Sequence, residues 1–106
     1  MDLRRGGGPL FSRVVRAGLL SEGQTLYLEY GPRGQERQRF AGTVRDDGIE
    51  LEGQVYSPSY AAVVCMQKAG SARQTANGWL MWKTEDGRLI NDKYNKYMTA
   101  AEEAES

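Results

Sequence analysis

The stretch "RFAGTVRDDGIELEGQVY", Arg39–Tyr56, is a strong indicator of the fold of this 106-residue chain. Apolar side chains recur at every second position on both sides of "DDG", with Phe40 and Val44 before this turn signal and Ile49 and Leu51 after it. A period of two is the side-chain period of β-strands, and an Asp-Gly pair between two such runs is typical of a tight turn. The stretch therefore predicts two antiparallel strands joined by a short turn.

The residues before this stretch predict another strand. "TLYLEY", Thr25–Tyr30, alternates, with Leu26 and Leu28 on one side of the chain. Residues 31–36 supply Gly, Pro and Gly, which are typical of a loop. Three antiparallel strands that follow one another along the chain form a meander.

Helix signals flank the meander on both sides. Before it, Pro9 suits a first helical turn and Gly18 suits a helix end. After it, Ser57 suits the N-cap of a second helix, Pro58 its first position and Gly70 its end. We therefore predict one helix on each side of the meander.

Two further elements are predicted near the C-terminus. The run "WLMWKTEDGRLI", Trp79–Ile90, predicts a hairpin around Asp86 and Gly87. The residues after it predict a short last helix, capped by Asn91 or Asp92.

Together these elements predict an α+β fold. Its small antiparallel sheet would consist of a three-strand meander plus a C-terminal hairpin, packed by two or three helices. Residues 1–8 are rich in Arg and Gly and are expected to form a flexible leader. The domain itself is expected to span residues 9–98, followed by an acidic flexible tail at residues 99–106.

The composition excludes several classes of enzyme. The sequence has no histidine and a single cysteine, Cys65, which removes Ser-His-Asp and Cys-His catalysis and zinc sites built from Cys and His. The acidic residues form no obvious constellation, so we expect no catalytic residue, no metal and no cofactor. A lone thiol in an apolar stretch suits a reducing interior, cytoplasm or nucleus. No apolar run approaches the roughly 18–20 residues that a membrane span needs, so no membrane partner is expected.

Charge is balanced overall but unevenly distributed. The chain has 14 basic and 14 acidic residues. Residues 1–45 carry eight arginines against four acids, whereas residues 46–67 carry four acids and no base. A net charge of zero implies that DNA binding by this domain alone is weak.

Three short motifs carry a resemblance to a known family. They are "AGLL" at Ala17–Leu20, "SPS" at Ser57–Ser59 followed by Ala61 and Ala62, and "NGW" at Asn77–Trp79 with Trp82 three residues on. In this order they resemble the RAMA domain, a module first described beside restriction enzymes and adenine methylases, over about residues 10–97. The chain looks like the version found in eukaryotic chromatin-linked proteins. The resemblance implies a nuclear α+β module without catalysis that binds DNA and senses modified bases such as 6-methyladenine.

The candidates for DNA contact are Ser57, Ser59, Arg73, Asn77, Trp82 and Lys83. The two serines would add donors to the free N–H groups at the start of the second helix, which suits a phosphate, although an ordinary helix cap explains them equally well. Arg73 and Lys83 flank the tryptophan segment and would contact phosphates, or else they are solvated surface charges.

The two tryptophans stand three residues apart, so in a strand they would face opposite sides. We predict that Trp79 belongs to the core. Trp82 would then border a surface groove and stack an extruded base. The alternative is that both rings are mostly buried.

A protein-interaction module is the alternative function. The neutral charge favours it, because a polyanion gains little from such a surface. A partner peptide would then dock in the groove beside the second helix, and the acidic residues 46–67 would meet a basic partner. That partner would belong to a nuclear chromatin or chromosome-associated complex.

Overall fold

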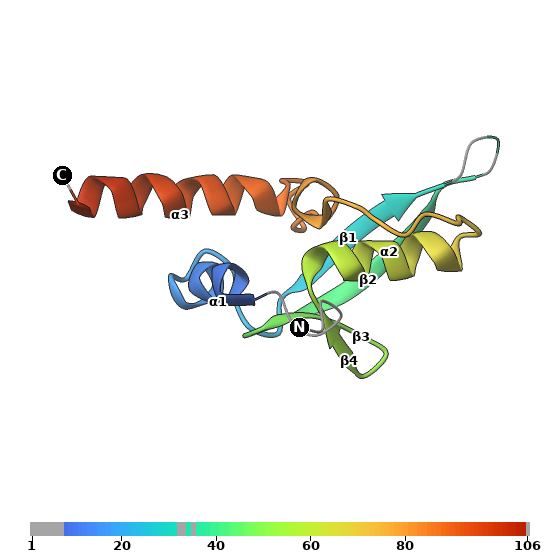
Figure 1. Cartoon of the computed structure of the whole chain (residues 1–106), viewed down its shortest axis with the longest axis horizontal. Helices are drawn as coiled ribbons and strands as arrows, with labels where there is room; N and C mark the ends of the chain where they lie inside the picture. The colour runs from blue at the N-terminus through green and yellow to red at the C-terminus, as the bar shows by residue number, and fades with distance from the viewer. Residues whose placement is uncertain (1–7, 32–33, 35, 106) are drawn as a thin grey trace.

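A computed structural model describes residues 8–31, 34 and 36–105. Figure 1 shows the elements in chain order: α1 (Gly8–Arg16), β1 (Thr25–Tyr30), β2 (Gln38–Arg45), β3 (Gly48–Leu51), β4 (Gln54–Tyr56), α2 (Pro58–Lys68), the 3-10 helix η1 (Gly78–Leu80) and α3 (Ile90–Glu105). The predicted α+β class is confirmed. The predicted leader lies outside the described residues, except for Gly8, which already belongs to α1.

The strands form one antiparallel sheet in the order β1-β2-β3-β4, as the predicted meander requires. The register places Leu28 opposite Phe40 and Val44 opposite Ile49. Directly opposed residues point to the same face, so these apolar side chains gather on one side of the sheet.

The residues predicted as a single third strand form two strands, β3 and β4. Glu52 and Gly53 connect them with φ angles of 50° and 83°. Two residues with positive φ make the tight hairpin turn whose twist suits antiparallel strands, and this turn pairs Leu51 with Gln54. The sequence did not indicate the turn because glutamate seldom adopts positive φ.

The predicted C-terminal hairpin does not form as two strands. Instead the side chain of Asn77 caps η1, because its Oδ1 accepts a hydrogen bond from the Trp79 N–H (3.2 Å). Beyond η1, Lys83 forms one isolated bridge to Tyr27 and one to Leu89. A local side-chain cap here outcompetes the extended conformation that the hairpin needed.

The second helix has the predicted boundaries. Ser57 is the N-cap of α2, and its Oγ accepts a hydrogen bond from the Tyr60 N–H (3.1 Å). Pro58 occupies the first helical position, where its missing N–H costs nothing. Ala69 is the C-cap, and Gly70 follows with a φ of 97° that suits glycine.

The last helix is longer than predicted. α3 continues through residues 99–105, which had been assigned to an acidic tail, and Figure 1 shows it extending past α1. Neither α3 nor any other described helix is long and apolar enough to cross a membrane.

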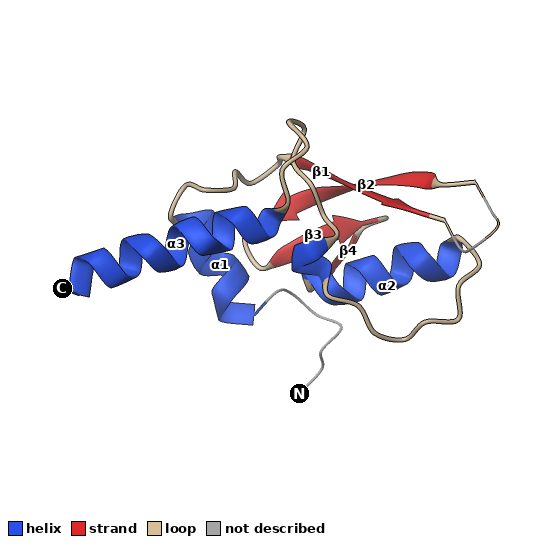
Figure 2. Ribbon diagram, turned by 90° about the horizontal axis from the view of Figure 1, so that it is seen from above, coloured by secondary structure: helices blue, strands red, loops and turns tan. Residues whose placement is uncertain are grey.

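The core lies between one face of the sheet and the helices. α2 runs along this face, whereas α1 and α3 pack side by side at one end of the molecule (Figure 2). The largest fully buried side chains are Trp82, Phe11, Leu20, Leu26, Leu28, Ile49, Met66 and Ile90. On the opposite face Tyr27, Ala41 and Thr43 are at least partly exposed, which explains the alternation in the sequence.

Candidate functional site

The first turn of α2 packs directly against η1. The Gly78 N–H donates a hydrogen bond to Ser59 Oγ (3.0 Å), and the indole Nε1–H of Trp82 donates one to the Pro58 carbonyl oxygen (3.0 Å). A Cβ at residue 78 would lie 2.1 Å from that carbonyl oxygen, so only glycine fits there. We call this contact between α2 and η1 the seam; it joins the "SPS" and "NGW" motifs.

The seam gives both serines a structural role. The Oγ of Ser57 caps the Tyr60 N–H, and the Oγ of Ser59 receives the Gly78 N–H. Both oxygens therefore satisfy backbone donors that would otherwise be orphaned near a helix start. The ordinary-cap interpretation accounts for these residues without a phosphate.

The predicted role of Trp82 is wrong, whereas Trp79 packs against the core as predicted but keeps part of its ring exposed. Trp82 is 0 % exposed, so it has no free ring face on which a base could stack. Trp79 is only partly buried, and its ring meets those of Phe11 and Tyr94 at centroid distances of 5.9 and 5.7 Å. The error arose because the segment was taken as a strand, whereas residues Gly78–Leu80 form η1, so the alternation of faces expected along a strand does not apply from Trp79 to Trp82.

Two other predicted contacts lie on the open surface. Arg73 is exposed in the connection after α2, and its carbonyl oxygen accepts a hydrogen bond from Gln67 Nε2 (3.1 Å). Lys83 is exposed as well, and its backbone pairs with Tyr27. Neither residue lines the cavities described below.

A small pocket lies where α1, η1 and α3 meet. It has a volume of about 110 Å³ and is lined by Leu10, Asn77, Trp79, Asn91 and Tyr94. We call it the aromatic pocket. Asn77 is the only one of the six predicted contact residues among those that line it.

The geometry of the aromatic pocket limits what it can hold. The rings of Trp79 and Tyr94 are tilted by 57° and already touch, so no base can be sandwiched between them. The Oδ1 of Asn77 is engaged by the Trp79 N–H, which leaves its NH₂ group to donate. Asn91 adds a second amide, so the pocket combines ring surface with directional polar groups.

Few features of the sequence indicated this pocket. Leu10, Asn91 and Tyr94 were assigned to helix stripes and caps, and they lie far from Asn77 in the chain. The available signal was the three-residue step from Asn91 to Tyr94, which places both on one helix face.

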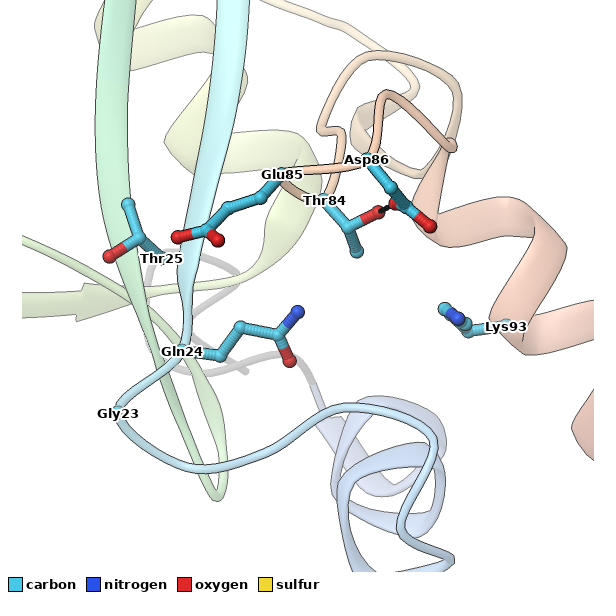
Figure 3. Close-up of a pocket in the computed structure, with 7 residues that line it drawn as sticks. All are labelled: Gly23, Gln24, Thr25, Thr84, Glu85, Asp86 and Lys93. Atoms are coloured by element: carbon cyan, nitrogen blue, oxygen red, sulfur yellow. Dashed lines mark hydrogen bonds between the residues drawn. The ribbon is translucent and has the colours of Figure 1, made fainter.

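A second, polar cavity of about 410 Å³ lies on the other side of the first turn of α3 (Figure 3). It is lined by Gly23, Gln24, Thr25, Thr84, Glu85, Asp86 and Lys93. The Thr84 hydroxyl donates a hydrogen bond to Asp86 and holds the pKa of this carboxyl below its usual value. Arg88 Nε lies 3.7 Å from the same carboxylate, so Asp86 is locally compensated.

The described residues contain no group of three or more His, Cys, Asp or Glu side chains placed to hold a metal. Cys65 is buried, and burial raises the pKa of its thiol to about 11. A thiol in this state stays neutral at physiological pH and is a poor nucleophile.

The fold and the aromatic pocket thus define a small α+β domain whose surface pocket is lined by aromatic rings and asparagine amides. The family model described as Restriction Enzyme Adenine Methylase Associated, or RAMA, matches residues 3–103. Since the match covers nearly the whole chain, the chain belongs to the RAMA family, as the motifs had predicted. Comparison with curated proteins gives no match.

Proposed function

We propose that this domain is a non-enzymatic DNA-binding module that reads a modified adenine through the aromatic pocket. The family description supports a methylation-related role, since it associates the domain with adenine methylases. The observation that carries the proposal is the pairing of two asparagine amides with two partly exposed aromatic rings in one pocket. Such a reader would act in the nucleus, beside chromatin proteins.

Asn91 is the residue best suited to contact the base. Within the described part of the chain nothing hydrogen-bonds its side chain, so both ends of its amide are available. An asparagine amide matches the N6–H donor and N7 acceptor of adenine. 6-Methyladenine keeps one N6–H, which donates to thymine while the base is paired, so this contact requires a base that has left its Watson–Crick pair. The methyl group then adds apolar surface.

The rings of Trp79 and Tyr94 would receive the methyl group. A volume of about 110 Å³ is well below the roughly 300–1,000 Å³ of a typical ligand pocket, so only the edge of a base enters. A methyl group against a ring face is stabilised by burial of apolar area, about 0.8 kcal/mol per buried carbon. The preference for a methylated base over an unmodified one is therefore modest.

Phosphate contacts would come from the exposed surface near the pocket. Lys83 follows Trp79 by four residues, which span at most about 14 Å of extended chain. This distance is shorter than one turn of duplex DNA, about 34 Å, so a single duplex can contact both the aromatic pocket and Lys83. With zero net charge the domain binds weakly alone, and a second binding domain in the same complex would raise the affinity.

The test is a titration of fluorescent duplexes, with and without one 6-methyladenine, over a series of salt concentrations. We expect salt-dependent binding and a preference of roughly 3- to 10-fold, up to about 1.4 kcal/mol, for the methylated duplex. Asn91→Ala should abolish the preference. Asn95→Ala is the matched control, because Asn95 is exposed on the same helix and does not line the pocket.

The absence of binding to either duplex at low salt would refute the proposal. If the wild-type domain bound both duplexes equally, the proposal of DNA binding would stand, but the proposal that the domain reads a modified base would be refuted. Loss of the preference in Asn95→Ala as well would show that the effect does not come from the pocket.

Protein binding is the second candidate function. Leu80 is 51 % exposed although it directly follows Trp79, and exposed large apolar side chains are typical of interaction surfaces. The start of α2 is already covered by η1, so a partner would contact the outer side of η1 rather than the predicted groove there.

A further inference from the structure

The polar cavity lies where a strand pairing stops. Tyr27 and Lys83 exchange both backbone hydrogen bonds, each with an N–O distance of 2.8 Å. The chain then turns away, since the Thr84 N–H donates to the Arg88 carbonyl oxygen (2.8 Å) and the Gly87 N–H to the Thr84 carbonyl oxygen (2.9 Å). The segment thus meets β1 at a single bridge.

The break leaves backbone groups of β1 facing the cavity. The Gln24 carbonyl oxygen accepts a hydrogen bond from the Val44 N–H (2.8 Å), and Leu26 pairs with β2 two residues later. Thr25 lies between them, so its N–H and C=O turn to the other side, the side on which Tyr27 is bridged. Thr25 lines the polar cavity, and its backbone offers a donor and an acceptor there.

The cavity also presents one cation and one anion for which the described part of the chain supplies no ion-pair partner. Within the described ranges, no ion pair joins Lys93 or Glu85 to another residue, whereas Asp86 is compensated as described above. Figure 3 shows Glu85 and Lys93 on opposite walls, with the Gln24 amide between them. The Oε1 of Gln24 accepts from the Ser21 N–H (2.9 Å), which leaves its NH₂ group for a ligand.

We infer that the polar cavity docks an extended peptide of a partner protein, which pairs its backbone with Thr25 and sets an acidic side chain against Lys93. Adding a strand to an open sheet edge gives a peptide main-chain hydrogen bonds, and the side-chain positions give it specificity. A basic side chain of the same peptide would meet Glu85. Nucleic acid fits less well, because two carboxylates face one ammonium group in this cavity.

This docking site is separate from the proposed DNA pocket. Lys93 lines the polar cavity, whereas Asn91 and Tyr94 line the aromatic pocket from the same helix. The two sites can therefore be tested with different variants, and either can fail alone.

The experiment pans the domain against a phage-displayed library of random short peptides and measures the enriched peptides by fluorescence anisotropy. The wild-type domain should enrich peptides with an acidic residue, and Lys93→Glu should enrich peptides with a basic residue at the same position. Lys96→Glu is the matched control, because Lys96 is exposed on α3 and does not line the cavity; it should select as the wild type does.

Thr25→Pro tests the backbone pairing itself. Proline removes the N–H, and it is tolerated at the first residue of an edge strand, which is the position of Thr25 in β1. We expect at least a tenfold loss of peptide affinity with the circular dichroism spectrum unchanged. No enrichment by the wild type, or the same acidic selection by Lys93→Glu, would overturn the inference. Full affinity in a folded Thr25→Pro domain would overturn it too.

Discussion

Trp82 and Trp79 belong to one motif and stand three residues apart, yet the fold uses them in opposite ways. Trp82 is fully buried and donates its indole hydrogen bond to Pro58 in the seam. Trp79 is partly exposed and borders the aromatic pocket with Tyr94. Trp82 therefore holds the η1 segment on α2, whereas η1 presents Trp79 at the surface.

The two roles depend on each other. Because the seam fixes η1 against the core, Trp79 has a defined orientation relative to α1 and α3. A recognition pocket needs residues whose positions are fixed by the packing around them, and the seam fixes Trp79 in this way. Damage to the seam should therefore lower stability and binding together, whereas damage to the pocket should lower binding with less loss of stability.

The largest effect is expected for Trp82→Ala. Removing a fully buried aromatic side chain costs about 3–5 kcal/mol, a large share of the stability of a small domain. Urea denaturation would measure the change. Trp82→Phe is the matched variant, because it keeps a buried ring but loses the hydrogen bond to Pro58. It should lower the free energy of unfolding by about 1–3 kcal/mol. If Trp82→Ala lost little stability, Trp82 would not be the residue that holds the η1 segment on α2.

Gly78→Ala should come next. The added Cβ would meet the Pro58 carbonyl oxygen at 2.1 Å, and separating the two backbones costs about 1–3 kcal/mol, as overpacking generally does. The melting temperature should fall, and DNA binding should fall with it. An alanine variant as stable as the wild type would show that the seam does not hold η1 in place.

Trp79→Ala should destabilise less than Trp82→Ala and should affect binding more. It loses two tilted ring contacts, with Phe11 and Tyr94, each worth about 0.5–1.5 kcal/mol. At a temperature well below its melting point, the variant should bind methylated and unmethylated duplexes equally. Retention of the preference by a folded Trp79→Ala domain would argue against the aromatic pocket.

The smallest effect on stability is expected for Asn77→Asp. The carboxylate can still cap η1 by accepting from the Trp79 N–H, so the free energy of unfolding should change by less than about 0.5 kcal/mol. The NH₂ donors of the pocket are lost and a negative charge is gained, so duplex binding should weaken. Asn77→Ala is the comparison variant, because it removes the cap of η1 as well. It should lower the free energy of unfolding by about 0.5–2 kcal/mol.

Local signals in the sequence predicted much of the fold. Ser57, Pro58 and Gly70 mark the ends of α2 correctly, because capping and φ preferences act within a few residues. The alternation around the "DDG" turn placed Val44 and Ile49 on one face, because strand geometry has a fixed period. The turn at Glu52 was missed because its residue type argues against the φ that it adopts.

The candidate site was predicted less well. Only Asn77 of the predicted contacts lines the aromatic pocket, and it was chosen from the family motif. The pocket needs α1, η1 and α3 to meet, and no short-range pattern encodes which side chains of three distant segments converge. The polar cavity likewise depends on where the pairing beside β1 stops, which is decided by the turn after Lys83.

The α+β class, the meander, the start of α2, the family and the lack of histidine could all be read from the sequence, because each rests on residue type, spacing or order along the chain. Which tryptophan is fully buried depends instead on the packing of distant segments. Both rings favour burial, but a buried indole N–H needs an acceptor. Trp82 has one, because the close approach at Gly78 places the Pro58 carbonyl oxygen 3.0 Å from its indole nitrogen. Burial is a property of what packs against a residue, and that is fixed by contacts between segments rather than by the segment itself.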